Sequence, residues 1–375
     1  LGFLEKGYAL HAEIVEEELD NYPFIGSMLV DMYVKCGLLF EARAVFDNLE
    51  VKDVVLWSTL ISGYVESGLG NEALDCFDMM VHDGISPNSV TFLSILKACG
   101  SIGSLEKGEE MHGHIIKEGL LGKDILLGSA LVDMYTKCGA MSKAQEVFDQ
   151  LPIQDVVCWN ALISGYAQHG PGEKALNCFN QMQNEGLFLD AIAYVCCLNA
   201  CATLEALDRG REIHAKISCN GFIITHLEVG NTLIGMYAKC GTLAKAQEVL
   251  DTLPFRSQFS WNALIAGYSQ QGKGHDALNC FERMQNEGLF PDVITYTCIV
   301  KACGMIGAIN KGKQMHDEIS RRGLLEKDVV LGSALVDMYA KCGALTKAIQ
   351  VLKELPIRNV VSWNALIAGF AQQGQ

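Results

Sequence analysis

Apolar residues recur along this chain at the spacing of amphipathic helices. In the segment 156–190, the spacing i, i+3, i+4, i+7 joins Trp159, Leu162, Ile163 and Tyr166. Gly170 interrupts this stripe, and Pro171 stands where a new helix can start. A second stripe, closed by Gly186, is formed by Ala175, Phe179 and Met182. The pattern predicts a hairpin of two helices, and no Val/Ile-rich alternating stretch demands a sheet.

The hairpin pattern returns with a period of 102 residues. The only tryptophans of the chain keep this spacing, at Trp57, Trp159, Trp261 and Trp363. The tripeptide Lys-Cys-Gly keeps it as well, beginning at Lys35, Lys137, Lys239 and Lys341, and so does a histidine series at His112, His214 and His316. A short hairpin cannot bury its apolar stripe alone, whereas stacked hairpins can. The period therefore predicts one all-α solenoid over 1–375, although the length alone would suggest two or three globular domains.

Each period divides into three related repeats of different length. The repeats of 35 residues are 54–88, 156–190 and 258–292, with a partial one at 360–375. The repeats of 36 residues are 89–124, 191–226 and 293–328, and 1–22 is the tail of another. The repeats of 31 residues are 23–53, 125–155, 227–257 and 329–359. Because the chain begins and ends inside a repeat, we expect it to be a fragment of a longer array.

The repeats resemble a known family. The run Val156-Val157-Cys158-Trp159-Asn160-Ala161-Leu162-Ile163-Ser164-Gly165-Tyr166, with Asn184-Glu185-Gly186-Leu187 at the end of the same repeat, is similar to a pentatricopeptide repeat. The alternation of 35, 36 and 31 residues resembles the plant PLS subclass of that family. Tetratricopeptide repeats share the hairpin but keep a constant length of about 34 residues. The resemblance covers essentially the whole chain and implies a right-handed α-solenoid of helix-turn-helix repeats.

The resemblance also implies a function. Family members bind single-stranded RNA, one base per repeat, in chloroplasts or mitochondria. The PLS subclass implies C-to-U editing, in which the array binds upstream of the edited cytidine and a deaminase absent from this chain acts. The expected partners are organellar RNA and either auxiliary editing proteins or a deaminase, and the chain is expected to be a monomer with no membrane contact.

In the family, the fifth residue and the last residue of a repeat pair with the edge of one base. Asn can donate and accept a hydrogen bond, whereas ionised Asp only accepts. The resemblance implies G for Ser27 with Asp53 and for Ser129 with Asp155, and A for Ser58 with Asn88 and for Ser333 with Asn359. It implies U for Asn160 with Asp190, with C tolerated, and for Asn262 with Asp292, and C for Asn231 with Ser257. Asn364 implies a pyrimidine.

The 36-residue repeats depart from this pattern. Leu93 with Asp124 and Val195 with His226 place an apolar residue in the reading position, so they should not select a base. Thr297 with Asp328 resembles a G pair. The predicted RNA is 5′-G-A-n-G-U-n-C-U-(G)-A-3′.

The second residue of a repeat flanks the base in the family. Stacking of bases on aromatic groups contributes about 1–3 kcal/mol per base. The candidate flanking residues are apolar: Phe24, Val55, Val90, Leu126, Val157, Ile192, Phe259, Ile294 and Val330. Glu228 breaks the series, because a carboxylate repels a nearby phosphate. The C assignment at Asn231 is therefore the weakest.

Composition narrows the classes further. The chain is 50% hydrophobic, which excludes wholesale disorder, and no apolar run reaches the about 18 residues of a membrane helix. The net charge of −15 argues against charge-driven binding of duplex nucleic acid. The 15 cysteines lie within helical patterns without any C-x-x-C pair, as expected for buried thiols in a reducing compartment. No targeting peptide is visible.

Simpler interpretations of the same residues stay open. An Asp before a helix is a standard N-cap, a role compatible with base reading. The Lys series either tracks phosphates or favours the C-terminal end of the helix dipole. We interpret the recurrent Cys, His and Trp residues as structural, because metal ligands at close spacing are missing. No deaminase, P-loop, nucleophile-elbow or dinucleotide signature is present, so we predict neither an enzyme nor a cofactor. Two alternatives remain: a protein-binding solenoid, and an RNA stability, splicing or processing factor.

Overall fold

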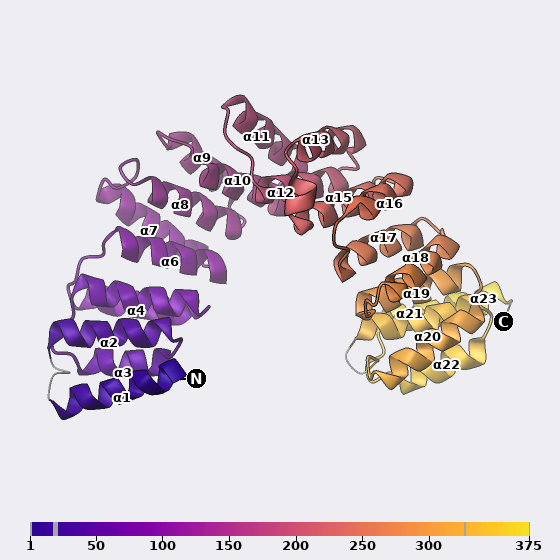
Figure 1. Cartoon of the computed structure of the whole chain (residues 1–375), viewed down its shortest axis with the longest axis horizontal. Helices are drawn as coiled ribbons and strands as arrows, with labels where there is room; N and C mark the ends of the chain where they lie inside the picture. Colours follow the sequence, from indigo (N-terminus) through magenta and orange to yellow (C-terminus); the bar gives the residue numbers. More distant parts are fainter. Residues whose placement is uncertain (1, 18–21, 326–327, 375) are drawn as a thin grey trace. The chain divides into compact units, whose positions relative to one another are not determined.

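A computed structural model describes residues 2–17, 22–325 and 328–374, and every regular element within these ranges is an α-helix (Figure 1). The first helices of the repeats are α2 (Pro23–Lys35), α4 (Val54–Glu66), α6 (Ser89–Ile102), α8 (Ile125–Lys137), α10 (Val156–His169), α12 (Ala191–Thr203), α15 (Leu227–Lys239), α17 (Gln258–Gln270), α19 (Val293–Met305), α21 (Val329–Lys341) and α23 (Val360–Gln372).

The second helices alternate with them along the chain. They are α1 (Gly2–Glu16), α3 (Leu39–Asn48), α5 (Gly70–His82), α7 (Leu105–Lys117), α9 (Met141–Gln150), α11 (Gly172–Asn184), α13 (Leu207–Cys219), α16 (Leu243–Thr252), α18 (Gly274–Asn286), α20 (Ile309–Arg321) and α22 (Leu345–Glu354). The sequence pattern did not predict α14 (Phe222–Thr225), a single turn in the loop after α13.

The chain divides into two compact halves, residues 1–193 and 194–375, with the division inside α12. In the first half, α2, α4, α6, α8 and α10 pack against one another in chain order and form one layer. In the second half, α15, α17, α19, α21 and α23 do the same. Second helices such as α3, α5, α9, α18 and α22 pack on their own first helix and on the next one, as α9 does on α8 and α10. Each half is therefore a stack of hairpins, which confirms the predicted all-α solenoid class.

The 31-residue repeats differ from the others in their second helix. Helices α3, α9, α16 and α22 have 10 residues, whereas α5, α7 and α11 have 13. The shorter repeat thus lacks about one helical turn. A buried leucine follows each short helix and fills the space beside a glycine of the first helix. At Gly128, a Cβ atom would lie 2.5 Å from Cδ2 of Leu151, so a side chain there would require the Leu151 side chain to move.

The predicted apolar stripes form the core. Trp57, Trp159 and Trp261 are at most 2% exposed, and Phe46 and Phe148 meet the first two edge-on with ring centroids 4.5 and 4.6 Å apart. The prediction fails at Trp363, which is 49% exposed, because no later helix of the described chain covers α23. Among the described residues, no helix combines the length and the apolar character that crossing a membrane requires.

Candidate functional site

The last residue of each repeat is the N-cap of the following first helix. At nine of these positions the side chain accepts a hydrogen bond from a backbone N–H in the first turn of that helix, at 2.7–3.2 Å. The nine are Asp53, Asn88, Asp124, Asp155, Asp190, Ser257, Asp292, Asp328 and Asn359. The capping interpretation is therefore confirmed, and each cap stabilises its helix by about 1 kcal/mol. Any reading role uses the atoms that capping leaves.

Five of the predicted reading pairs are joined directly. Asn160 Nδ2 donates to Asp190 Oδ2 at 2.7 Å, and Asn262 Nδ2 donates to both Asp292 oxygens at 3.0 and 3.1 Å. The other pairs have longer bonds, from Ser129 to Asp155 and from Ser333 to Asn359 at 3.1 Å, and from Asn231 to Ser257 at 3.4 Å. Residues 26 or 30 positions apart thus meet as one polar group at the start of a first helix.

A threonine that the sequence analysis missed takes part in two pairs. Thr295, the third residue of α19, donates through Oγ1 to Oδ1 of Asn262 at 2.6 Å and to Asp292 at 2.8 Å. Thr91 likewise lies 2.7 Å from Ser58 Oγ and bonds Asn88 at 3.0 Å. The recurrence of threonine after two periods, from 91 to 295, was the signal that could have found it. In the 36-residue repeat that lies between these two, the equivalent residue is Ala193, which has no hydroxyl.

The missing hydroxyl leaves one reading residue with an unused acceptor. Asn160 Oδ1 is buried and has no hydrogen-bond partner in the described chain, and the same holds for Asn231 Oδ1. By contrast, both ends of the Asn262 amide are engaged, and that side chain is only 6% exposed. Asn160 and Asn262 therefore differ chemically although they occupy the same place in their repeats.

Among the other predicted positions, Thr297 and Asp328 bond to different partners. Thr297 Oγ1 donates to the backbone of its own helix at Val293, while Asp328 caps α21. His226 is exposed, makes no cap and lies 4.8 Å from the Phe222 ring. The apolar Leu93 and Val195 are half-buried, Asn364 is exposed on α23, and Ser27 is half-buried on α2, one helix before the cap Asp53.

The candidate flanking residues form a row of exposed apolar side chains. All nine are 54–76% exposed: Phe24, Val55, Val90, Leu126, Val157, Ile192, Phe259, Ile294 and Val330. Each is the second residue of a first helix, two positions after the cap. Glu228 holds the equivalent place in α15 and is exposed too. Within each half, these side chains offer apolar contacts to flat rings beside the polar pairs, except in the repeat of Glu228.

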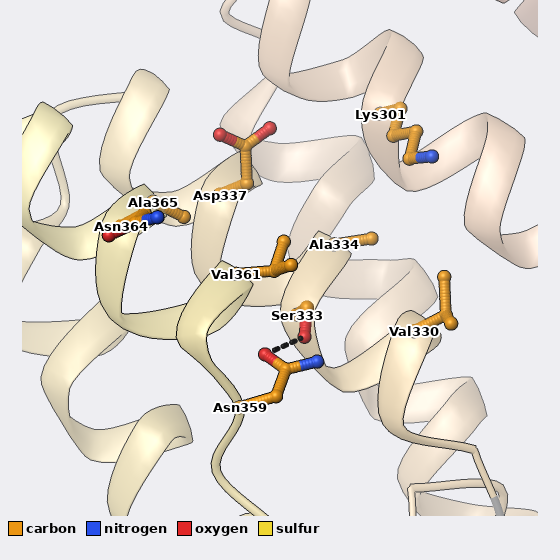
Figure 2. A pocket seen from close by; sticks show the side chains of 9 residues that line it. All are labelled: Lys301, Val330, Ser333, Ala334, Asp337, Asn359, Val361, Asn364 and Ala365. Atoms are coloured by element: carbon orange, nitrogen blue, oxygen red, sulfur yellow. Dashed lines mark hydrogen bonds between the residues drawn. The ribbon is translucent and has the colours of Figure 1, made fainter.

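A cavity of about 470 Å³ shows how these elements combine. Figure 2 shows Ser333 bonded to Asn359, with the flanking residue Val330 and Val361, the second residue of α23, nearby. Asn364 lines the same cavity from α23, and Lys301 lines it from α19. Apolar side chains beside a donor and acceptor pair suit a planar ring with a hydrogen-bonding edge. Within the described ranges, no three His, Cys, Asp or Glu residues gather as a metal site would require.

Family models match most of the chain. The model described as the PPR repeat family matches 52–101, 154–203 and 256–305. The model described as the PPR repeat matches 27–54, 90–120, 129–153, 294–324, 333–360 and 361–375. The chain belongs to the pentatricopeptide repeat (PPR) family. All of these matches are to repeat units.

Curated relatives carry the same family name. A chloroplastic PPR-containing protein of Arabidopsis thaliana is 36% identical over 99% of this chain and 59% of its own length. A second chloroplastic protein is 35% identical over 99% and 46%, and a mitochondrial one is 35% identical over 99% and 36%. The chain thus spans about a third to three fifths of the length of these relatives.

Solved structures share the fold. The PPR protein PPR10, in complex with an 18-nucleotide psaJ RNA element, superposes with a TM-score of 0.80 at 19% identity, covering 96% of this chain and 55% of PPR10. PPR10 from maize superposes with a TM-score of 0.67 at 21% identity, covering 100% and 60%. At these identities the likeness establishes the PPR fold alone.

Other recurrent residues of this PPR chain have structural partners. His112, His214 and His316 bond the hydroxyls of Tyr135, Tyr237 and Tyr339 at 2.8–3.0 Å, and burial lowers the pKa of each histidine. Burial also raises the pKa of the Cys99 thiol to about 12 and those of Cys201 and Cys303 to about 11. These thiols pack in the core, so the structural interpretation is confirmed for both series.

The four lysines of the Lys-Cys-Gly series differ in whether they form an ion pair. Lys35, Lys137 and Lys341 each form an ion pair of 2.7 Å with an Asp four residues earlier, namely Asp31, Asp133 and Asp337. Lys239 has Gly235 at that position and no ion pair in the described chain.

Proposed function

We propose that this PPR chain binds single-stranded RNA sequence-specifically, one base per repeat, and thereby specifies sites of C-to-U editing for a deaminase. The recognised sequence is 5′-G-A-n-G-U-n-C-U-(G)-A-3′, read by the five joined pairs together with Ser27 and Asp53, Ser58 and Asn88, Thr297 and Asp328, and Asn364. The names of the curated relatives support action in chloroplasts or mitochondria. The alternation of 35, 36 and 31 residues supports the editing role.

One observation carries the RNA assignment. Polar pairs that differ in chemistry from repeat to repeat stand beside apolar side chains that are uniformly exposed. A single-stranded nucleic acid is complementary to this combination, because every base has an apolar face for the apolar side chains and a distinct polar edge for the polar pairs. The bound RNA in the complex of PPR10, which shares this fold, supports the same class of ligand.

The test is fluorescence anisotropy with RNAs that differ at one base. Changing the U opposite Asn160 and Asp190 should weaken binding by about 1 kcal/mol, or about fivefold, because one base-edge hydrogen bond is lost. Changing the base opposite Leu93 should have no effect. Asn160→Thr should move the preference at that position from U toward G. Equal binding of all RNAs would contradict base reading and favour a protein partner.

Editing requires a separate measurement. In cells that lack the protein, sequencing of organellar transcripts should show lost C-to-U conversion at cytidines just downstream of the recognised sequence. If RNA binding is specific but no conversion is lost, the chain serves RNA stability, splicing or processing instead.

A further inference from the structure

The flanking residues lie on one face of the first helices, called here the flanking face, and the charged side chains on this face differ with the repeat length. Seven residues after each flanking position, two helical turns along the same face, the side chain depends on the repeat length. The 35-residue repeats carry small residues there: Ser62, Ser164, Ala266 and Ala368. The 36-residue repeats carry Lys97, Asn199 and Lys301. The 31-residue repeats carry Asp31, Asp133, Gly235 and Asp337.

Substitutions on this face keep the summed formal charge of three positions constant from one 102-residue period to the next. In the first and third complete periods, the lysine of the 36-residue repeat is followed by the Asp–Lys pair of the next repeat. In the middle period, Asn199 replaces that lysine and Gly235 replaces that aspartate, which leaves Lys239 alone. The formal charge of the three positions is therefore +1 in every period. A joint loss of one cation and one anion keeps this sum constant.

The ion pairs determine which lysine is available. Lys137 and Lys341 are bonded at 2.7 Å to Asp133 and Asp337. Lys97, Lys239 and Lys301 are exposed and form no ion pair or hydrogen bond within the described ranges. Each period thus presents one unpaired ammonium group on the face that carries the exposed apolar row.

This face otherwise repels RNA. Six of the caps are aspartates, and the chain has a net charge of −15. Some lysines of the second helices are engaged elsewhere, as Lys143 is with Glu109 and Lys311 with Glu282. Phosphates that follow the bases along this face therefore need the unpaired lysines of the first helices.

The position of these lysines suits a phosphate. Lys97 and Lys301 lie seven residues, about 10 Å along the helix, after their flanking residue, and Lys239 lies eleven residues, about 16 Å, after Glu228. Side chains lean toward the helix N-terminus, which brings each ammonium group back toward the flanking position. Lys301 lines the same cavity as Ser333 and Asn359 (Figure 2). A backbone phosphate beside a base in that cavity lies on the side from which the lysine reaches.

We propose that Lys97, Lys239 and Lys301 are phosphate-binding residues, one per 102-residue period, that hold the backbone of single-stranded RNA. The inference rests on the proposed RNA binding. The proposal gives a role to the two 36-residue repeats whose reading position is apolar, at Leu93 and Val195. In these places a lysine, on the first helix of the same repeat (Lys97) or of the next repeat (Lys239), holds the RNA backbone although no base is selected. One cation then serves every three nucleotides.

The test is the salt dependence of RNA binding by the whole 375-residue chain. Removing three phosphate contacts in K97Q/K239Q/K301Q should reduce the slope of log affinity against log salt by about 2, since each contributes about 0.7 for a single strand. At about 0.1 M salt, the affinity should fall about 100-fold, or about fivefold per lysine. Base preference should stay unchanged. Gly235→Asp alone, which rebuilds the ion pair of Lys239, should weaken binding by up to about fivefold.

A matched variant controls for net charge. K143Q/K245Q/K347Q removes three lysines from the second helices α9, α16 and α22 and should leave slope and affinity nearly unchanged. A triple variant that keeps the wild-type slope, or a control that loses as much, overturns the inference while RNA reading stands. If the wild-type chain binds no RNA, the proposed function fails and this inference falls with it.

Discussion

Replacing Ala193 by Thr should weaken base reading by Asn160. In the equivalent place, Thr295 donates its hydroxyl to Asn262 Oδ1 at 2.6 Å, and Asn262 is nearly fully buried. Asn160 Oδ1 has no such partner. If Asn160 reads a base as proposed, and bound RNA gains access to this buried atom, the N3–H group of uracil can donate to it, whereas N3 of cytosine carries no hydrogen and cannot. On the proposed function, the unused acceptor therefore favours U over C at Asn160. The same argument favours U at Asn231, for which the family pattern implies C.

The size of the effect follows from one hydrogen bond. A net contribution of about 1 kcal/mol corresponds to about fivefold in affinity. In Ala193→Thr, the preference for U over C at this position should fall by up to that factor. The same bond satisfies a buried acceptor, so the free energy of unfolding should rise by up to about 1 kcal/mol. Space is available, because the buried Thr91 and Thr295 occupy the same site of the fold.

The assay compares two RNAs that differ only at this base, using anisotropy, and adds urea denaturation of each variant. Ala193→Val is the matched control, since it has the shape of threonine without the hydroxyl and should keep the wild-type preference. Thr295→Ala should sharpen the preference for U at Asn262. An Ala193→Thr chain that discriminates as well as the wild type, or a valine variant that loses as much, would refute the reasoning.

Three further outcomes follow from the structure. Asp155→Ala should lower the free energy of unfolding by about 1 kcal/mol, while Asp155→Asn, an equally good cap, should change it little, as urea denaturation can measure. Burial lowers the pKa of His316 and of its counterparts His112 and His214, so the unfolded chain takes up protons at a higher pH than the folded chain does. The melting temperature should therefore fall as the pH drops below about 6.5 and stay flat above it. The fall should be less steep in His316→Gln. With its pKa raised to about 11, Cys303 should resist maleimide at about pH 8, whereas the exposed Cys219 should react, as mass spectrometry would show.

The periodic part of the structure could be predicted from the sequence. The spacing of Trp159, Leu162 and Tyr166 indicates one buried helix face, and all three are at most 2% exposed. Helical periodicity describes residues three to seven apart, so it cannot name partners on other helices. The bond from His316 to Tyr339 and the extra turn α14 were therefore not predicted.

The candidate site was predictable only in outline. The resemblance named the pairs that stacking brings together, such as Asn160 with Asp190. The difference between Asn160 and Asn262 depends on residues 193 and 295, which lie in the following repeat and bear on the amide through packing. The pairing of Lys137 by Asp133 could be read from i, i+4 spacing, but its absence at Lys239 matters only once the flanking face is known.

The double use of the cap limits how such an array can change its target. The last residue of a repeat must first cap the next helix by accepting a hydrogen bond from a backbone N–H of its first turn, and only Ser, Thr, Asp, Asn and Gly suit this position well. Nine of these positions hold Asp, Asn or Ser, whereas Tyr22 and His226 form no side-chain cap. Evolution can thus exchange letters within a small set of short polar side chains at little cost in folding. If the caps read bases as proposed, helix capping limits which residues can stand at these positions before RNA selects among them.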